Sequence, residues 1–114
     1  MPHIDYYFSV LSPNTYLAGT RLEAVAVKHG ATITYKPIDL MALFARTGGT
    51  PPPQRHESRQ ELRRQELRRQ AAKLGMKLKV NPPHWPTNPA PASYAFIAAQ
   101  KNGDGNLGAL VHAI

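Results

Sequence analysis

Only two segments of this 114-residue chain combine the alternation and the residue types of β-strands, and both lie within its first 38 residues. Residues 4–10 alternate between two faces, one of them strongly apolar, which favours a half-buried strand. Residues 31–38 predict a second strand that ends near Pro37, because proline cannot donate to a strand ladder. A two-stranded sheet is only marginally stable in water. We therefore expect further strands from an absent C-terminal part or from a second copy of this chain.

A single helix is expected between the two strands. Ser12 is a preferred N-cap residue, and Pro13 is tolerated at the first helical position because no intrahelical bond needs its N–H there. Apolar positions continue to Val27, and Gly30 has the place of a C-terminal cap. With short connections on both sides, this strand–helix–strand run predicts a βαβ unit with parallel strands and a right-handed crossover.

The rest of the chain has helix and loop patterns. The expected fold class is therefore α/β, with a βαβ part at residues 1–38 and an all-α part at residues 39–114. The apolar pattern that starts at Leu107 stops after two turns, which suggests a truncated chain. The expected elements are a short helix at 39–45, a proline-rich loop at 46–53, a long helix at 57–74, and a helix at 92–101 with Tyr94, Ile97 and Ala98 facing inward.

The sequence contains no cysteine, which excludes disulfides, thiolate metal sites and a protein-borne dithiol centre. Any thiol chemistry would need a thiol from a small molecule. The five histidines show no i,i+4 pairing, so no metal site is expected. No apolar run approaches the roughly 20 residues of a membrane-spanning helix. The first residues lack a signal-peptide pattern, so we expect a cytoplasmic protein without a membrane partner.

Positive charge is concentrated in one segment. The formal net charge is +7, and residues 55–79 contain nine basic and three acidic side chains. Such a segment can attract nucleic acid or anionic ligands. A solvated helix face is the simpler interpretation. Because no aromatic side chain is interleaved with these arginines, nucleic acid is not the expected partner.

Ser12 is the main candidate for chemistry. It lies where the first strand turns into a helix, and backbone N–H groups at a helix start favour an anion or a thiolate. A serine hydroxyl there could donate a hydrogen bond to a bound thiolate and lower the pKa of that thiol. Ser-Pro is also common at ordinary helix starts, so the pair alone leaves a purely structural cap as the alternative.

The segment Asp5-Tyr-Tyr-Phe-Ser-Val-Leu-Ser-Pro-Asn-Thr-Tyr-Leu-Ala resembles the opening of the 2-hydroxychromene-2-carboxylate isomerases and of the kappa-class glutathione transferases. Both families belong to the DsbA-like branch of the thioredoxin superfamily, in which a Ser-Pro pair takes the place of the redox Cys-Pro pair. Thr47-Gly-Gly-Thr-Pro-Pro resembles the substrate-side loop, and Gln65-Glu-Leu-Arg-Arg resembles the helix that follows. The resemblance implies a thioredoxin-like fold whose all-α part is an insertion and whose C-terminal βα half is absent.

The resemblance implies a glutathione-dependent isomerase that interconverts 2-hydroxychromene-2-carboxylate and trans-o-hydroxybenzylidenepyruvate in aromatic catabolism. Ser12 would activate the glutathione thiol, which adds to the substrate, allows rotation about a carbon–carbon bond and leaves again. Gly49 stands where the family often has asparagine, and Asn14 where an aromatic is usual. Glutathione contacts are expected from Ser12, Asn14 and Arg59, and contacts to a small aromatic substrate from Phe44, Gly49, Gln54, Arg55 and Trp85.

The same residues have simpler structural interpretations. Gln54, Arg55 and Arg59 could be solvated side chains, Phe44 could belong to a core, and Trp85 could anchor a core or a lid. A kappa-type glutathione transferase, a basic interaction fragment, and an inactive fragment that folds by pairing are the alternative functions. A homodimer is expected.

Overall fold

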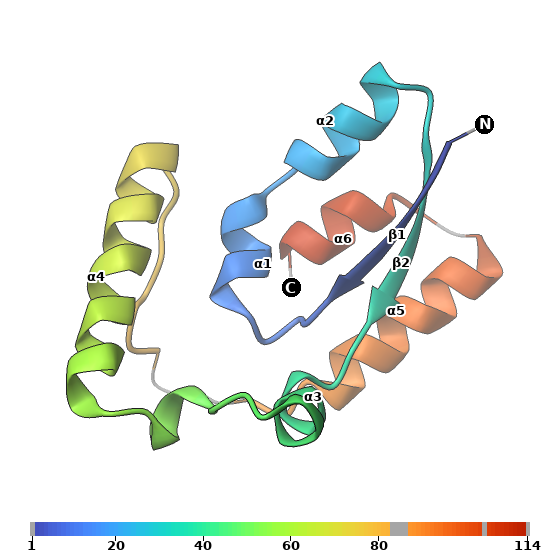
Figure 1. The fold of residues 1–114 in the computed structure, drawn as a ribbon. Coiled ribbons are helices and arrows are strands. Elements are labelled where there is room, and N and C mark those ends of the chain that lie inside the picture. Colours follow the sequence, from blue (N-terminus) through green and yellow to red (C-terminus); the bar gives the residue numbers. More distant parts are fainter. Residues whose placement is uncertain (1, 83–86, 104, 114) are drawn as a thin grey trace. The chain divides into compact units, whose positions relative to one another are not determined.

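Figure 1 shows the computed structural model of the chain, which describes residues 2–82, 87–103 and 105–113. The chain divides into two compact units, each described here by itself. The first unit comprises Met1–Ile38 and Asn88–Ile114, and the second unit comprises Asp39–Thr87. The sequence-based division joined residues 39–114 in one part. Residues 88–114 instead group with residues 1–38, because the helix that begins at Ala90 packs against the second strand.

The first unit is built on two parallel strands. Its elements are β1 (His3–Phe8), α1 (Pro13–Ala18), α2 (Arg21–Lys28), β2 (Thr32–Pro37), α5 (Ala90–Asn102) and α6 (Leu107–Ala113). The register places His3 of β1 opposite Thr32 of β2, and Phe8 opposite Pro37. The predicted α/β class and the βαβ start are confirmed.

β1 ends two residues earlier than the alternating pattern predicted. The hydroxyl of Ser9 is buried and accepts the Leu11 N–H at 3.2 Å, while the Ser9 carbonyl accepts the Ser12 N–H at 3.2 Å. These two bonds form a tight turn. Val10 therefore belongs to the turn although its side chain still packs on the core.

The single helix predicted between the strands is two helices. Gly19 has φ 58° and ψ −132°, a conformation that other residues rarely adopt, and it ends α1. The side chain of Arg21 donates two hydrogen bonds, from Nε to the Ala18 carbonyl at 3.1 Å and from Nη2 to the Leu17 carbonyl at 3.1 Å. These bonds satisfy carbonyls that the broken helix leaves open. The crossover therefore has a bend that apolar spacing alone does not reveal.

The core of the first unit is aromatic. Phe96 of α5 is fully buried, with its ring centroid 5.3 Å from that of Phe8 and 5.4 Å from that of Tyr35, both at steep interplanar angles. Edge-to-face pairs of this kind are favourable beyond the area that they bury. Val111 of α6 completes the buried cluster. The core thus joins both strands to two helices that follow them by more than fifty residues.

The inward face of α5 differs from the prediction. Tyr94 and Ile97 are 70% and 46% exposed, and Ala98 is also exposed. Phe96 points inward instead, together with Gln100 one turn later. The face that carries Phe96 is buried because its ring packs against Phe8 of β1 and Tyr35 of β2.

The second unit is dominated by one helix. Its elements are α3 (Leu40–Thr47), a short 3-10 turn (Pro52–Gln54) and α4 (Glu57–Leu74). α4 has the predicted bounds, beginning after His56, whose side chain accepts the Ser58 N–H at 3.1 Å, and ending at Gly75 in the left-handed conformation. Local capping therefore fixes both of its ends.

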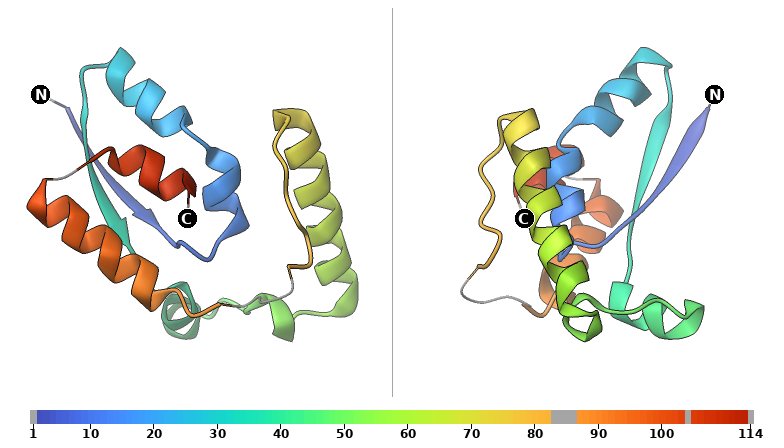
Figure 2. Two further views of the ribbon diagram at one scale, coloured as in Figure 1. Left: turned by 180° about the vertical axis from the view of Figure 1, so that it is seen from behind. Right: turned by 60° about the vertical axis from the view of Figure 1, so that its left-hand side comes forward.

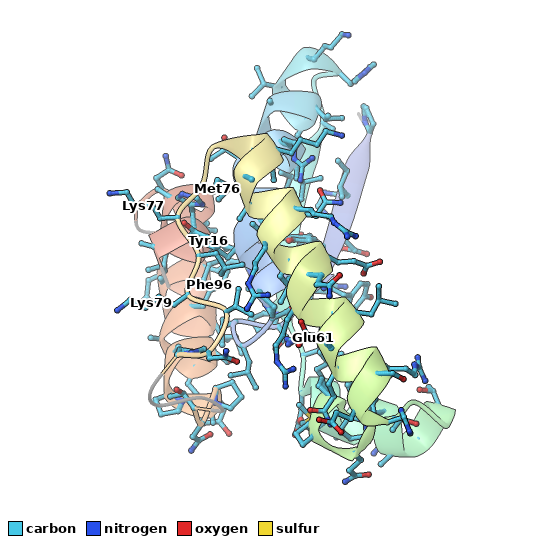
Figure 3. All side chains as sticks on the ribbon, turned by 90° about the vertical axis from the view of Figure 1, so that its left-hand side faces the viewer. Tyr16, Glu61, Met76, Lys77, Lys79 and Phe96 are labelled. Carbon is cyan, nitrogen blue, oxygen red and sulfur yellow. The ribbon has the colours of Figure 1, made fainter. Side chains whose placement is uncertain are left out.

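The chain that follows α4 runs back alongside that helix (Figures 1 and 2). Met76, Lys77 and Lys79 lie on this returning segment, and Glu61 lies on the helix itself (Figure 3). Glu61 accepts a hydrogen bond from Arg64 at 2.8 Å and lies 3.9 Å from Arg68.

None of the helices in the described ranges is long and apolar enough to cross a membrane.

Candidate functional site

Ser12 lies at the junction between β1 and α1. Its backbone is extended, with φ −76° and ψ 126°, and its hydroxyl oxygen accepts the Asn14 N–H at 3.2 Å. A serine hydroxyl can accept and donate at the same time. Since this bond uses only the oxygen, the hydroxyl proton is available to a ligand. The structure therefore joins two predicted site residues, Ser12 through its side chain and Asn14 through its backbone.

The contacts around α1 fix the position of Ser12. On one side, the Ser9 turn holds the Ser12 N–H. On the other side, Leu17 is buried, and the ring of Tyr16 stacks on His112 of α6 with centroids 5.5 Å apart and an interplanar angle of 12°. Ser9 and His112 have no recognisable motif in the sequence, and His112 lies a hundred residues from Ser12 along the chain.

Phe44 and Gly49 are in close contact within the second unit. The Gly49 N–H donates to the Phe44 carbonyl at 3.0 Å, beside the left-handed cap at Gly48. A Cβ built on Gly49 would lie 2.5 Å from Cδ1 of the Phe44 ring. Any side chain at position 49 must therefore displace that ring. The observed position of the Phe44 ring therefore requires glycine at position 49. The sequence of the loop did not predict this contact.

Arg55 lies at the start of an arginine-rich surface. Its Nε donates to the Thr50 carbonyl at 2.8 Å, and the amide of Gln60 donates to the Arg55 carbonyl at 2.9 Å. Burial, and then the positive charges of Arg55 and Arg64, lower the pKa of the Arg63 guanidinium. Arg63 and Arg55 therefore lie in a region where positive charge is concentrated. An anion would relieve that repulsion.

The remaining predicted residues are less organised. Gln54 and Arg59 are exposed, on the 3-10 turn and on the first turn of α4. Trp85 lies outside the described residues. Ser12 and Asn14 belong to the first unit, whereas Phe44, Gly49, Gln54, Arg55 and Arg59 belong to the second. Within the described ranges, no group of three or more histidine, aspartate or glutamate side chains is placed to hold a metal ion.

Comparisons with known proteins point to one family. The sequence model of the DSBA-like thioredoxin domain matches residues 3–114. A 2-hydroxychromene-2-carboxylate isomerase of Pseudomonas putida is 42% identical over 52 residues, which are 46% of this chain and 26% of that protein. One of Sphingobium xenophagum is 46% identical over 37 residues, covering 32% of this chain and 19% of its own length.

A solved structure of a 2-hydroxychromene-2-carboxylate isomerase superposes on this chain with a TM-score of 0.69 and 28% sequence identity. The match covers 96% of this chain and 53% of the solved one. The chain therefore spans about half the length of the structure that it resembles.

Proposed function

The chain belongs to the DSBA-like thioredoxin domain family, and we propose that its Ser12 activates glutathione for the isomerisation of an aromatic acid. The proposed reaction interconverts 2-hydroxychromene-2-carboxylate and trans-o-hydroxybenzylidenepyruvate. The proposal is supported by the relatives named 2-hydroxychromene-2-carboxylate isomerase. The observation that carries it is the Ser12 hydroxyl, which is oriented by the Asn14 N–H and retains a proton to donate.

The residues of the first unit fit a bound thiol. The chain has no cysteine, so a sulfur nucleophile must come from a small molecule. When bound, glutathione would supply a thiol that adds reversibly to the conjugated double bond of the substrate and so permits rotation about that carbon–carbon bond. A hydroxyl that donates to the sulfur favours the thiolate over the thiol and therefore lowers the pKa of the thiol.

Ser12 would act as a hydrogen-bond donor throughout the reaction. Its oxygen accepts the Asn14 N–H, and its proton would donate to the sulfur of bound glutathione. The buried turn at Ser9 and the Tyr16–His112 stack hold this geometry before any ligand binds. Such preorganisation avoids the cost of ordering the donor at the moment of reaction.

Arginines of the second unit suit the carboxylates of this chemistry. We propose that Arg59 binds a carboxylate of glutathione and that Arg55, with Arg63 beside it, binds the substrate carboxylate. Phe44, Gly49, Gln54 and Trp85 would contact the aromatic part of the substrate. Because the Phe44 ring lies where a side chain at position 49 would project, glycine lets this ring keep its observed position.

The test is a pair of measurements on this chain and on Ser12→Ala. Glutathione binding is followed by the fluorescence of Trp85, the one tryptophan, and isomerisation is followed by the absorbance of the substrate. We expect saturable binding and a glutathione-dependent rate that Ser12→Ala lowers by about 10²–10³-fold, the usual cost of one catalytic hydrogen-bond donor. The pH at which half of the bound thiol ionises should rise in this variant.

Ser93→Ala is the matched control. It removes a hydroxyl that donates to the carbonyl of Pro89, the residue before α5, and that lies apart from the proposed site residues, so binding and rate should be unchanged. Equal isomerisation by Ser12→Ala would contradict the assigned role. Absence of glutathione binding by the chain would remove the proposed activity from these 114 residues. Net formation of a glutathione conjugate, without isomerisation, would indicate a kappa-type transferase instead.

A further inference from the structure

The loop that precedes α4 is rich in proline and short of backbone donors. Residues 51–53 are all proline and have no N–H, so their backbone offers carbonyl groups alone. The N–H groups of Gln54 and Arg55 donate back to the carbonyls of the first two prolines at 3.0 and 3.2 Å and close the 3-10 turn. The other carbonyls of this loop that have a partner depend on side chains.

Gln60 of α4 supplies two of these side-chain bonds. Its amide nitrogen donates to the Arg55 carbonyl at 2.9 Å and, at the longer distance of 3.4 Å, to the Pro53 carbonyl. A side-chain amide has two N–H bonds, so one group can serve both carbonyls. Gln60 is partly buried, whereas Gln65 and Gln70 of the same helix are exposed. Gln60 therefore ties α4 to two points of the loop.

The guanidinium of Arg55 folds back on the same loop. Its Nε donates to the Thr50 carbonyl at 2.8 Å, so one side chain closes the loop across residues 50–55. This bond uses Nε, and the two terminal nitrogens, Nη1 and Nη2, have no hydrogen-bond partner among the described residues. Two parallel N–H groups of a guanidinium match the two oxygens of a carboxylate. The geometry therefore favours a carboxylate bound end-on by Arg55.

We propose that Gln60 is a positioning residue for the substrate carboxylate, because it holds the segment from which the Arg55 side chain projects. This inference rests on the proposed function, in which Arg55 binds that carboxylate. Gln60 acts through Arg55 and does not itself touch the substrate. Without its amide, the carbonyls of Arg55 and Pro53 lose a donor, and the segment before α4 gains conformational freedom. A guanidinium on a freer segment must be ordered when the carboxylate binds, which weakens binding.

The fixed position of Arg55 also works against charge repulsion. Burial, and then the positive charges of Arg55 and Arg64, lower the pKa of the Arg63 guanidinium. Like charges this close move apart where the chain is free to do so. The bonds that Arg55 makes with Gln60 and Thr50 oppose that movement. Two positive groups are therefore kept together before an anion arrives, which lowers the cost of binding it.

The test compares the unchanged chain with Gln60→Met and Gln70→Met. Methionine has nearly the length of glutamine and a similar helix propensity, but no N–H to donate. Gln70 is exposed on the same helix, so its variant is the matched control. Binding of trans-o-hydroxybenzylidenepyruvate is measured without glutathione from the NMR signal of the Arg55 Nε–H. We expect Gln60→Met to raise the dissociation constant about tenfold, as the loss of one hydrogen bond can, and Gln70→Met to leave it unchanged.

A second readout separates positioning from a general loss of structure. With glutathione present, Gln60→Met should raise KM for the acid about tenfold and leave kcat within about twofold, because the thiol step depends on Ser12. Exchange of the Arg55 Nε–H with solvent should become faster in this variant, since the loop that holds it is looser. Amide protection in the middle of α4 should stay as it is in the unchanged chain.

The outcomes distinguish the role of Gln60 from the proposed function. Equal binding of the acid by Gln60→Met and the unchanged chain, or equal exchange of the Arg55 Nε–H in both, would overturn the positioning role. So would a lower kcat at constant KM. Acid binding that Gln60→Met weakens, without isomerisation by either protein, would support the positioning role and contradict the proposed activity. Failure of the unchanged chain to bind the acid would overturn both.

Discussion

The two units are stabilised by interactions of very different reach along the chain. In the first unit, Gln100 bonds to Tyr35 across 65 residues, and Phe96 packs on both strands. In the second unit, by contrast, Gln60 bonds to Pro53 only seven residues away, and His56 caps α4 through Ser58, two residues away. Long-range contacts form together or not at all, whereas local contacts can form and break singly. The first unit should therefore unfold cooperatively, and the second should lose structure piece by piece.

The largest effect is expected from Phe96→Ala. Removing a fully buried aromatic side chain typically costs about 3–5 kcal/mol, which is enough to unfold a small unit. Amide protection should disappear throughout the first unit while α4 keeps its helical chemical shifts. Ile97→Ala, at the exposed neighbouring position, is the control and should change stability little. Simultaneous loss of the helical chemical shifts of α4 would contradict this difference in unfolding between the two units.

A smaller effect is expected from Tyr35→Phe. The Tyr35 hydroxyl donates to Oε1 of Glu23 at 2.8 Å, and the other oxygen, Oε2, is buried without a partner among the described residues. Removing the donor leaves a carboxyl group with neither oxygen satisfied, at a cost of about 1–3 kcal/mol. Urea unfolding of the first unit measures this cost. Tyr94→Phe loses an exposed hydroxyl and should be neutral.

The same contact predicts a loss of stability in alkali. Burial, then the hydrogen bond and the charge of Glu23, raise the pKa of Tyr35 above its ordinary value of 10.0. The unfolded chain thus loses this proton at lower pH than the folded unit does. The stabilisation is complete below pH 10.0 and falls as the pH rises beyond it. Urea unfolding at several pH values should show this slope, and Tyr35→Phe should reduce it.

The smallest effect is expected at the start of α4. His56→Ala removes the side chain that accepts the Ser58 N–H, and the loss of such a cap costs about 1 kcal/mol. Fraying should be confined to the first turn of α4, detected as faster amide exchange there, with no change in the first unit. His29→Ala removes an exposed histidine from the first unit and is the control. Protection lost in the first unit of His56→Ala would contradict the local character of the second.

Much of the site was predictable because local rules determine it. Ser12 accepts an N–H in the next turn, as an N-cap serine before proline should, and that requires no distant partner. The Phe44–Gly49 contact was not predictable, since it depends on the conformation of the cap at Gly48. The electrostatic influence of Arg55 on Arg63 also escaped prediction, because Arg55 precedes α4 in extended backbone and shares no helical face with Arg63.

The sequence alone determined the βαβ start, the N-cap at Ser12 and both ends of α4, because alternation, capping residues and glycine act over a few neighbouring positions. Only the tertiary structure decided that Phe96 faces inward and that Gln100 covers the outer edge of β2. These features depend on which surfaces meet when segments about 65 residues apart come together. Burial and edge pairing depend on contacts between distant segments, so no short stretch of sequence predicts them.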